Sequence, residues 1–200
     1  MSNLATLIAQ MYISLMPAVF AGILNMIWCK LPVCEALRKP IDGGKNFFDG
    51  KRILGCNKTW KGFLGMILFG SITTVIWGFI CSKSNYLTLN NYIYVNYQNS
   101  LSYNLLMGAL FGFAYALFEL PNSFLKRRFD IKPGKTISGI KKVFFIFFDQ
   151  ADSVFGCVLI ICFVYNMSIW FYFLYVLIGA VTHILLNMLL YLLKLRKNMF

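Results

Sequence analysis

The sequence is poor in acidic residues, in histidine and in charge of any kind. Only seven of its 200 residues are Asp or Glu, one is His, and charged residues make up 13% of the chain. So little charge, beside 59% hydrophobic residues, excludes a soluble globular domain, in which about 25% of residues are charged. The six cysteines form no C-x-x-C pair, and the sequence contains only one histidine, which argues against a zinc site.

What the sequence has instead is long apolar runs. A transmembrane β-barrel would show alternating segments of about ten residues, whereas a membrane-spanning helix takes about 20 apolar residues. The sequence therefore predicts an all-α integral membrane protein, with residues 1–200 as a single domain. About five transmembrane helices are expected, at residues 8–28, 63–81, 101–120, 143–165 and 169–193.

The basic residues are distributed unevenly between these runs. Residues 29–61 hold eight Lys or Arg, residues 121–142 hold seven and the C-terminal tail holds three, whereas residues 82–100 hold only Lys83. The positive-inside rule therefore predicts an outside N-terminus, a cytoplasmic C-terminus and two long basic cytoplasmic loops, in a multi-pass protein of the cytoplasmic membrane. The net charge of +12 is explained by this topology and by attraction to anionic lipid, so no nucleic-acid partner is expected.

All seven acidic residues lie in or beside the basic loops, and two of them lie within an apolar run. Asp149 and Asp152, in "FFDQADSVFG", are three residues apart and share one face of the predicted fourth helix. Carboxylates inside a membrane are costly and indicate a functional site. They suit Mg²⁺, which binds one or two carboxylates together with substrate phosphates. A proton relay, or an ion pair with Lys141 or Lys142, is the alternative.

The end of the third apolar run carries a second candidate cluster. Glu119, in "FELPN", is a candidate to bind an ion or to orient Lys126, or it has no role. Pro121 is expected to end the helix, so that "NSFLKRR" enters the loop. There Lys126, Arg127 and Arg128 make either an anion site or a cytoplasmic anchor.

The first basic loop has the composition of a phosphate-binding segment. Its stretch "KPIDGGKNFFDGKRILGCNKTWKG", residues 39–62, holds six basic residues and five glycines. Gly50 and Gly55 have the spacing of a P-loop, but the Lys-Thr pair comes two residues late and no strand precedes it, so a Walker A motif is excluded. The chemistry remains: glycines allow close backbone approach, and Lys and Arg neutralise phosphate. Together these features predict a site for a nucleoside triphosphate, a divalent metal and a lipid.

Two other features are interpreted as packing. Gly108 and Gly112 form a GxxxG pattern, which permits close helix contact. His183 and Asn187 share one face of the last predicted helix and are expected to be a satisfied polar packing pair.

Three motifs in order, "PIDGGKNFFDGKRILGCNKTWKGF", "NSFLKRRFDIKPG" and "FFDQADSVFG", resemble those of the CDP-archaeol synthases, over nearly the whole chain. These are integral-membrane CTP-dependent cytidylyltransferases related to the CDP-diacylglycerol synthases. The resemblance implies that CTP and a lipid phosphate, 2,3-di-O-geranylgeranylglyceryl phosphate or similar, give a CDP-lipid and pyrophosphate with Mg²⁺ in phospholipid biosynthesis. It assigns the metal to Asp149 and Asp152, and catalytic roles to both and to Lys58 and Lys126. The residues that it places around CTP are Asp42, Lys45, Asp49, Gly50, Arg52, Gly55, Lys58, Thr59, Asn122, Ser123, Lys126 and Arg127.

One departure from the wider superfamily bears on the lipid. Gln150 stands where Arg would follow the first Asp, and no His-Gly-Gly stretch is present, which favours the archaeol-type branch. Phosphatidate cytidylyltransferase activity is the alternative, and a small membrane transporter is a further one. The sequence does not give the oligomeric state.

Overall fold

The computed structural model describes residues 3–131 and 141–194, without the side chains of residues 141–144. Residues 132–140, in the second predicted basic loop, and 195–200, in the basic tail, lie outside the described residues. Five long helices are present, each with a stretch long and apolar enough to cross a membrane, as predicted. They are α1 (Leu4–Lys30), α2 (Trp60–Ser82), α4 (Leu101–Arg128), α5 (Lys141–Val164) and α6 (Ile169–Leu192). Two short elements, η1 (Glu35–Leu37) and α3 (Asn85–Leu89), lie in the connections.

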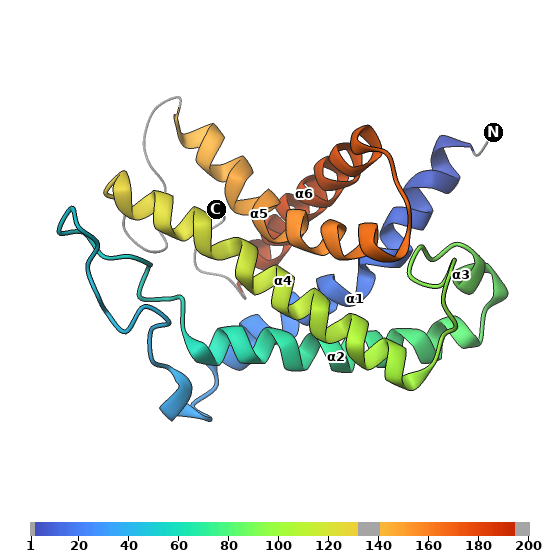
Figure 1. The fold of residues 1–200 in the computed structure, drawn as a ribbon, viewed down its shortest axis with the longest axis horizontal. Helices are drawn as coiled ribbons and strands as arrows, with labels where there is room; N and C mark the ends of the chain where they lie inside the picture. Colours follow the sequence, from blue (N-terminus) through green and yellow to red (C-terminus); the bar gives the residue numbers. More distant parts are fainter. Residues whose placement is uncertain (1–2, 132–140, 195–200) are drawn as a thin grey trace.

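The helices pack in a chain of neighbours. α2 packs against both α1 and α4, α4 against α5, and α5 against α6 (Figure 1). The 31–59 segment, called loop 1 below, lies at one end of the bundle beside the C-terminal end of α4, and α3 lies at the other end (Figure 1). Three of the long helices, α2, α4 and α6, begin after a hydroxyl side chain that caps them: Thr59, Ser100 and Ser168 each accept a backbone N–H from the first turn.

Close contact between α2 and α4 depends on glycine. A Cβ on Gly108 would clash with the carbonyl oxygen of Gly70, and a Cβ on Gly112 with that of Met66. Backbones this close leave no room for a side chain, which is why small residues mark such interfaces in membranes. The packing interpretation of the GxxxG pattern is confirmed.

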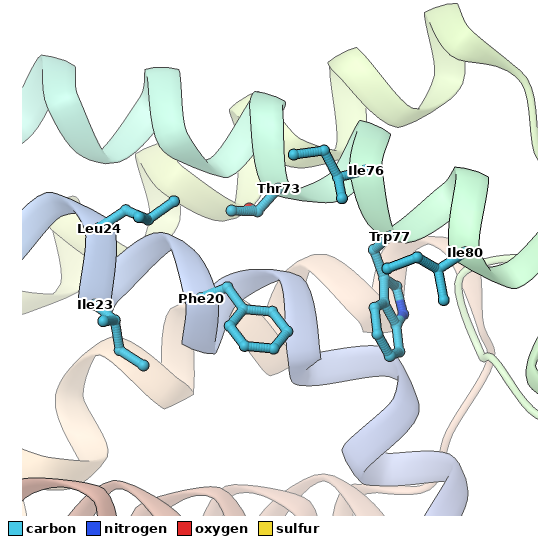
Figure 2. Close-up of a pocket in the computed structure, with 7 residues that line it drawn as sticks. All are labelled: Phe20, Ile23, Leu24, Thr73, Ile76, Trp77 and Ile80. Atoms are coloured by element: carbon cyan, nitrogen blue, oxygen red, sulfur yellow. The ribbon is translucent and has the colours of Figure 1, made fainter.

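α1 contains a proline, and α2 supplies the hydrogen-bond donor that this proline removes. Pro17 has no N–H, so the carbonyl of Ile13 loses its helical donor. The indole Nε1 of Trp77 donates to that carbonyl at 2.9 Å, and Thr73 Oγ1 donates to the Pro17 carbonyl, also at 2.9 Å. Beside this junction the two helices enclose an apolar groove of about 210 Å³ (Figure 2). The polar groups that line this groove, Thr73 Oγ1 and Trp77 Nε1, are thus already bonded to protein carbonyls.

The expected break at Pro121 is wrong. α4 continues through Pro121 to Arg128 and includes the whole "NSFLKRR" stretch. A proline removes one helical hydrogen bond, which membrane helices tolerate where their surroundings supply other partners. Here Asn122 and Ser123, the two residues after Pro121, are buried and bonded to other segments. The continuation places these two residues and Lys126 on a rigid element.

The α2–α4 contact gives a stability prediction. Gly108→Val places a branched side chain against the backbone of α2, and we expect a melting temperature lower by roughly 2–12 °C, since overpacking costs about 1–3 kcal/mol. Leu106→Val, at a position 58% exposed on the same helix, is the matched control and should melt close to the wild type. Thermal unfolding in detergent measures both, and equal melting temperatures would contradict the packing role.

Candidate active site

The Asp pair of α5 faces α4. The side-chain amide nitrogen of Asn122 donates to both carboxylates, at 2.7 Å from Asp149 Oδ1 and 2.8 Å from Asp152 Oδ2. Lys126, one helical turn after Asn122, forms an ion pair with the other oxygen of Asp149. The structure thus gives Asp149 a lysine partner on α4, whereas the side chains of Lys141 and Lys142, the alternative partners, lie outside the described residues. Because α4 continues past Pro121, Lys126 lies on the helix and can reach Asp149.

A second lysine reaches the same place from loop 1. Lys58 forms an ion pair with Glu119 of α4, so of the alternatives for Glu119 the structure shows a lysine partner, but Lys58 in place of Lys126. Burial alone would lower the pKa of Lys58, but the carboxylates of Glu119, Asp152 and Asp149 outweigh it and raise the pKa above its ordinary value. Lys58 therefore keeps its positive charge throughout the neutral range.

The donor set of the cluster fits Mg²⁺. Within residues 3–131 and 141–194, no group of three or more His, Cys, Asp or Glu side chains is placed to hold one ion. Two carboxylates on adjacent turns of one face, Asp149 and Asp152, remain. Mg²⁺ keeps several waters and is commonly held by one or two carboxylates plus substrate phosphates. The site therefore suits a cation that arrives with, or is completed by, a phosphorylated ligand.

Loop 1 is folded around its own acidic residues. The Asp42 side chain is 1% exposed and accepts hydrogen bonds from the backbone N–H of Gly44 (2.9 Å) and Leu54 (2.8 Å) and from Arg52 (2.9 Å). Burial alone would raise the pKa of Asp42, but these donors outweigh it and hold the pKa below its ordinary value. Asp42 therefore maintains the loop, and its carboxylate is engaged within the protein.

The tip of loop 1 is tied to the end of α4. Asp49 accepts from Lys51 N at 3.0 Å and from Arg128 Nη1 at 2.6 Å. The Arg128 guanidinium also lies 5.1 Å from the ring centroid of Phe47 and 4.7 Å from that of Phe124. Gly50, at φ +75°, makes the turn between these contacts, a conformation that favours glycine. Asp49 and Arg128 thus dock the loop.

A second contact joins loop 1 to α4 near the Asp pair. The backbone N–H of Gly55 donates to Ser123 Oγ at 3.0 Å, and a Cβ on Gly55 would lie 2.5 Å from the Asn57 side chain. The hydroxyl of Thr59 accepts from Gly62 N and so caps the N-terminus of α2. Lys45 is exposed on the loop surface.

Three arginines retain donor capacity beside these contacts. Among the described residues, the buried Nε atoms of Arg52, Arg127 and Arg128 have no hydrogen-bond partner. Arg52 already uses another nitrogen on Asp42. Guanidinium groups bind phosphate oxygens well, and an unpaired buried N–H favours such a ligand. This arrangement can hold an anion between loop 1 and the end of α4.

Apart from Lys45, Arg52 and Arg127, the predicted site residues fall into two groups in the structure. Lys58, Asn122, Lys126, Asp149 and Asp152 meet in one cluster, which Glu119 joins. Asp42, Asp49, Gly50, Gly55, Thr59 and Ser123 build and dock the loop. The partner of Glu119 was missed because Lys58 is 61 residues away in sequence and no local pattern connects them.

The buried carboxylate of loop 1 gives a pH prediction. A group whose pKa is lowered by folding contributes stability above its unfolded pKa, about 4 for Asp, and that stability is lost as the pH falls through the folded pKa. We expect Asp42→Asn to melt below the wild type at pH 7, with a difference that shrinks below about pH 4. Asp130→Asn is the control, because the Asp130 side chain is 74% exposed. A difference that is constant with pH would contradict the assignment.

The chain is similar to known proteins along most of its length. The family model described as CarS-like CDP-archaeol synthase matches residues 4–200. A CDP-archaeol synthase of Archaeoglobus fulgidus is 35% identical over 132 residues, which cover 62% of this chain and 70% of that protein. One of Thermococcus gammatolerans is 32% identical over 132 residues, 66% of each chain. The chain thus spans about two thirds of the length of these relatives.

A solved structure has a similar fold. It is described as "Structural insight into an intramembrane enzyme for archaeal membrane lipids biosynthesis", and it matches with a TM-score of 0.59 at 21% identity. The match covers 88% of this chain and 92% of that one. On the match of the family model to residues 4–200, the chain belongs to the CDP-archaeol synthase family.

Proposed function

We propose that the protein transfers the cytidylyl group of CTP to the phosphate of an archaeol-type membrane lipid, giving a CDP-lipid and pyrophosphate. One observation carries this proposal: Lys58 and Lys126, each on a carboxylate, meet the Asp pair where loop 1, α4 and α5 come together. Two cations and two carboxylates that can serve as metal ligands are what a triphosphate–metal complex needs. Membership of a family whose named relatives are CDP-archaeol synthases supports the same activity.

In the proposed reaction, an oxygen of the lipid phosphate attacks the α-phosphorus of CTP. A new P–O bond forms as the bond between the α-phosphorus and its bridging oxygen breaks, and pyrophosphate carries away the electron pair. The protein needs no covalent intermediate, since positioning and charge neutralisation supply catalysis in such transfers. Lys58 and Lys126 neutralise the phosphates at the reacting end, and Arg52 and Arg127 hold the rest of the triphosphate.

Asp149 and Asp152 are the residues that would hold Mg²⁺. When bound, the ion would neutralise charge on phosphate oxygens as a Lewis acid. Asn122 keeps both carboxylates turned toward α4, and Lys126 is held within reach of the same ligand. The chain therefore prearranges its oxygen ligands and its cations on facing helices, which is how electrostatic catalysis avoids reorganisation during the reaction.

The proposed placement in the cell follows from charge. Loop 1 and the end of α4, which lie at the same end of the bundle (Figure 1), carry most of the described basic residues. The cluster includes a lysine from each of them, Lys58 and Lys126. The positive-inside rule puts that end in the cytoplasm, with the N-terminus outside and the C-terminus inside. In the cytoplasmic membrane this arrangement supplies CTP from the cytoplasm and the lipid phosphate from the adjacent leaflet.

Substitution of one residue from each half of the cluster tests the site. We expect Asp152→Asn and Lys58→Ala to lower the rate of transfer from labelled CTP to lipid by about 100-fold or more, since each removes a charge that stabilises the transition state. Lys83→Ala, at the opposite end of α2, removes a lysine from the other loop and should leave the rate unchanged. Full activity in both site variants would refute the assignment of these residues.

A lipid panel tests the substrate. We expect purified protein to use archaeol-type ether lipid phosphate faster than phosphatidate, by about tenfold or more, because ester carbonyls brought into an apolar environment lose hydrogen bonds to water. Initial rates with both lipids in the same detergent, at equal CTP, measure the preference. A faster rate with phosphatidate would favour the phosphatidate cytidylyltransferase alternative.

A further inference from the structure

The helix behind the Asp pair carries three polar side chains in an otherwise almost wholly apolar span. Thr182, His183 and Asn187 lie within one and a half turns of α6. Polar groups in a membrane helix are costly unless they are bonded, and they commonly join neighbouring helices. Thr182 bonds to the Tyr12 hydroxyl of α1 at 2.9 Å. The other two point to a different helix.

His183 and Asn187 both contact one residue of α5, Gln150. Asn187 Nδ2 donates to the side-chain oxygen of Gln150, and His183 Nδ1 lies 3.1 Å from its backbone oxygen. Because that oxygen only accepts, Nδ1 carries the proton in this contact. Gln150 and Asn187 are 2% and 6% exposed. The two polar residues of α6 are satisfied as expected, but through Gln150 of α5.

Gln150 immediately follows the first residue of the Asp pair. Successive residues of an α-helix point about 100° apart, so a helix that turns Gln150 toward α6 turns Asp149 and Asp152 toward α4. Apolar contacts have no preferred direction, whereas hydrogen bonds are directional. The neighbours of Gln150 on α5 are mostly Phe, Val, Ile and Ala, whose contacts are not directional. The bonds to Gln150 therefore favour the same rotation of α5 that the bonds of Asn122 and Lys126 to the Asp pair require.

We propose that Gln150, Asn187 and His183 form a polar clamp that sets the rotation of α5 and so aims Asp149 and Asp152 at Asn122 and Lys126. These are positioning residues, because they act through the Asp pair and lie on its far side. This inference rests on the proposed function. It assigns a role to the residue that stands where the wider superfamily has Arg, and to the polar positions of α6.

Asn187→Leu tests the clamp, with three measurements on each variant in detergent. We expect kcat to fall about tenfold or more and the Kd for Mn²⁺, read by electron paramagnetic resonance, to rise about tenfold, as for residues that orient metal ligands. The KM for CTP should change less than kcat, because the arginines and loop 1 are untouched. Thr182→Val is the matched control: it removes an interhelical bond of α6 to α1 and should leave kcat and the Mn²⁺ Kd unchanged.

The double variant Gln150→Leu/Asn187→Leu separates positioning from stability. It removes both partners, so no polar group is left unpaired and the melting temperature should return toward that of the wild type. The clamp requires kcat and Mn²⁺ affinity to remain low in this variant, which also serves if Asn187→Leu alone fails to fold. Recovery of both, or equal effects of Asn187→Leu and Thr182→Val, would overturn the clamp. A wild type that neither transfers nor binds Mn²⁺ would instead refute the proposed function.

Discussion

The structure depends on how α4 satisfies two carboxylates that α5 carries into its apolar length. Leaving such groups unpaired costs far more than a membrane helix can offset, so their partners constrain everything nearby. Asn122 and Lys126 supply those partners one turn apart, which requires α4 to remain helical beyond Pro121. Glu119, one turn earlier on the same helix, then requires a cation of its own, and Lys58 supplies it from loop 1. One helix face thus constrains both its neighbour and the loop.

This dependence explains which parts of the protein could be predicted from sequence. The five spanning helices follow from apolar length alone, and the Asp pair was noticed because carboxylates are rare in such runs. The predicted end of the helix at Pro121 is wrong because the tendency of proline to break a helix is a local one. The bonds of Asn122 and Ser123 that stabilise the continued helix come from α5 and loop 1. Pairings such as Lys58 with Glu119 leave no local trace in a sequence.

Loop 1 shows why a strongly basic segment contains carboxylates of its own. A loop with six basic residues repels itself, and in the free protein no ligand offsets that repulsion. Asp42 and Asp49 offset it by accepting from Arg52, from Arg128 and from three backbone N–H groups. The loop is therefore folded before a ligand arrives, and binding energy is not used to order it. The two acids that the sequence prediction placed around CTP thus maintain the fold of the loop.

The two lysines of the cluster must exchange partners if the proposed function holds. In the free protein Lys58 and Lys126 are held by Glu119 and Asp149, which keeps cations and carboxylates in place without exposing a large positive field. A triphosphate carries enough negative charge to draw both ammonium groups, and a divalent cation can then take the place of Lys126 on Asp149. Neither exchange is favourable alone, because each would leave a partly buried charge without its partner. Nucleotide and metal are therefore expected to bind cooperatively, since each supplies the counter-charge that the other displaces.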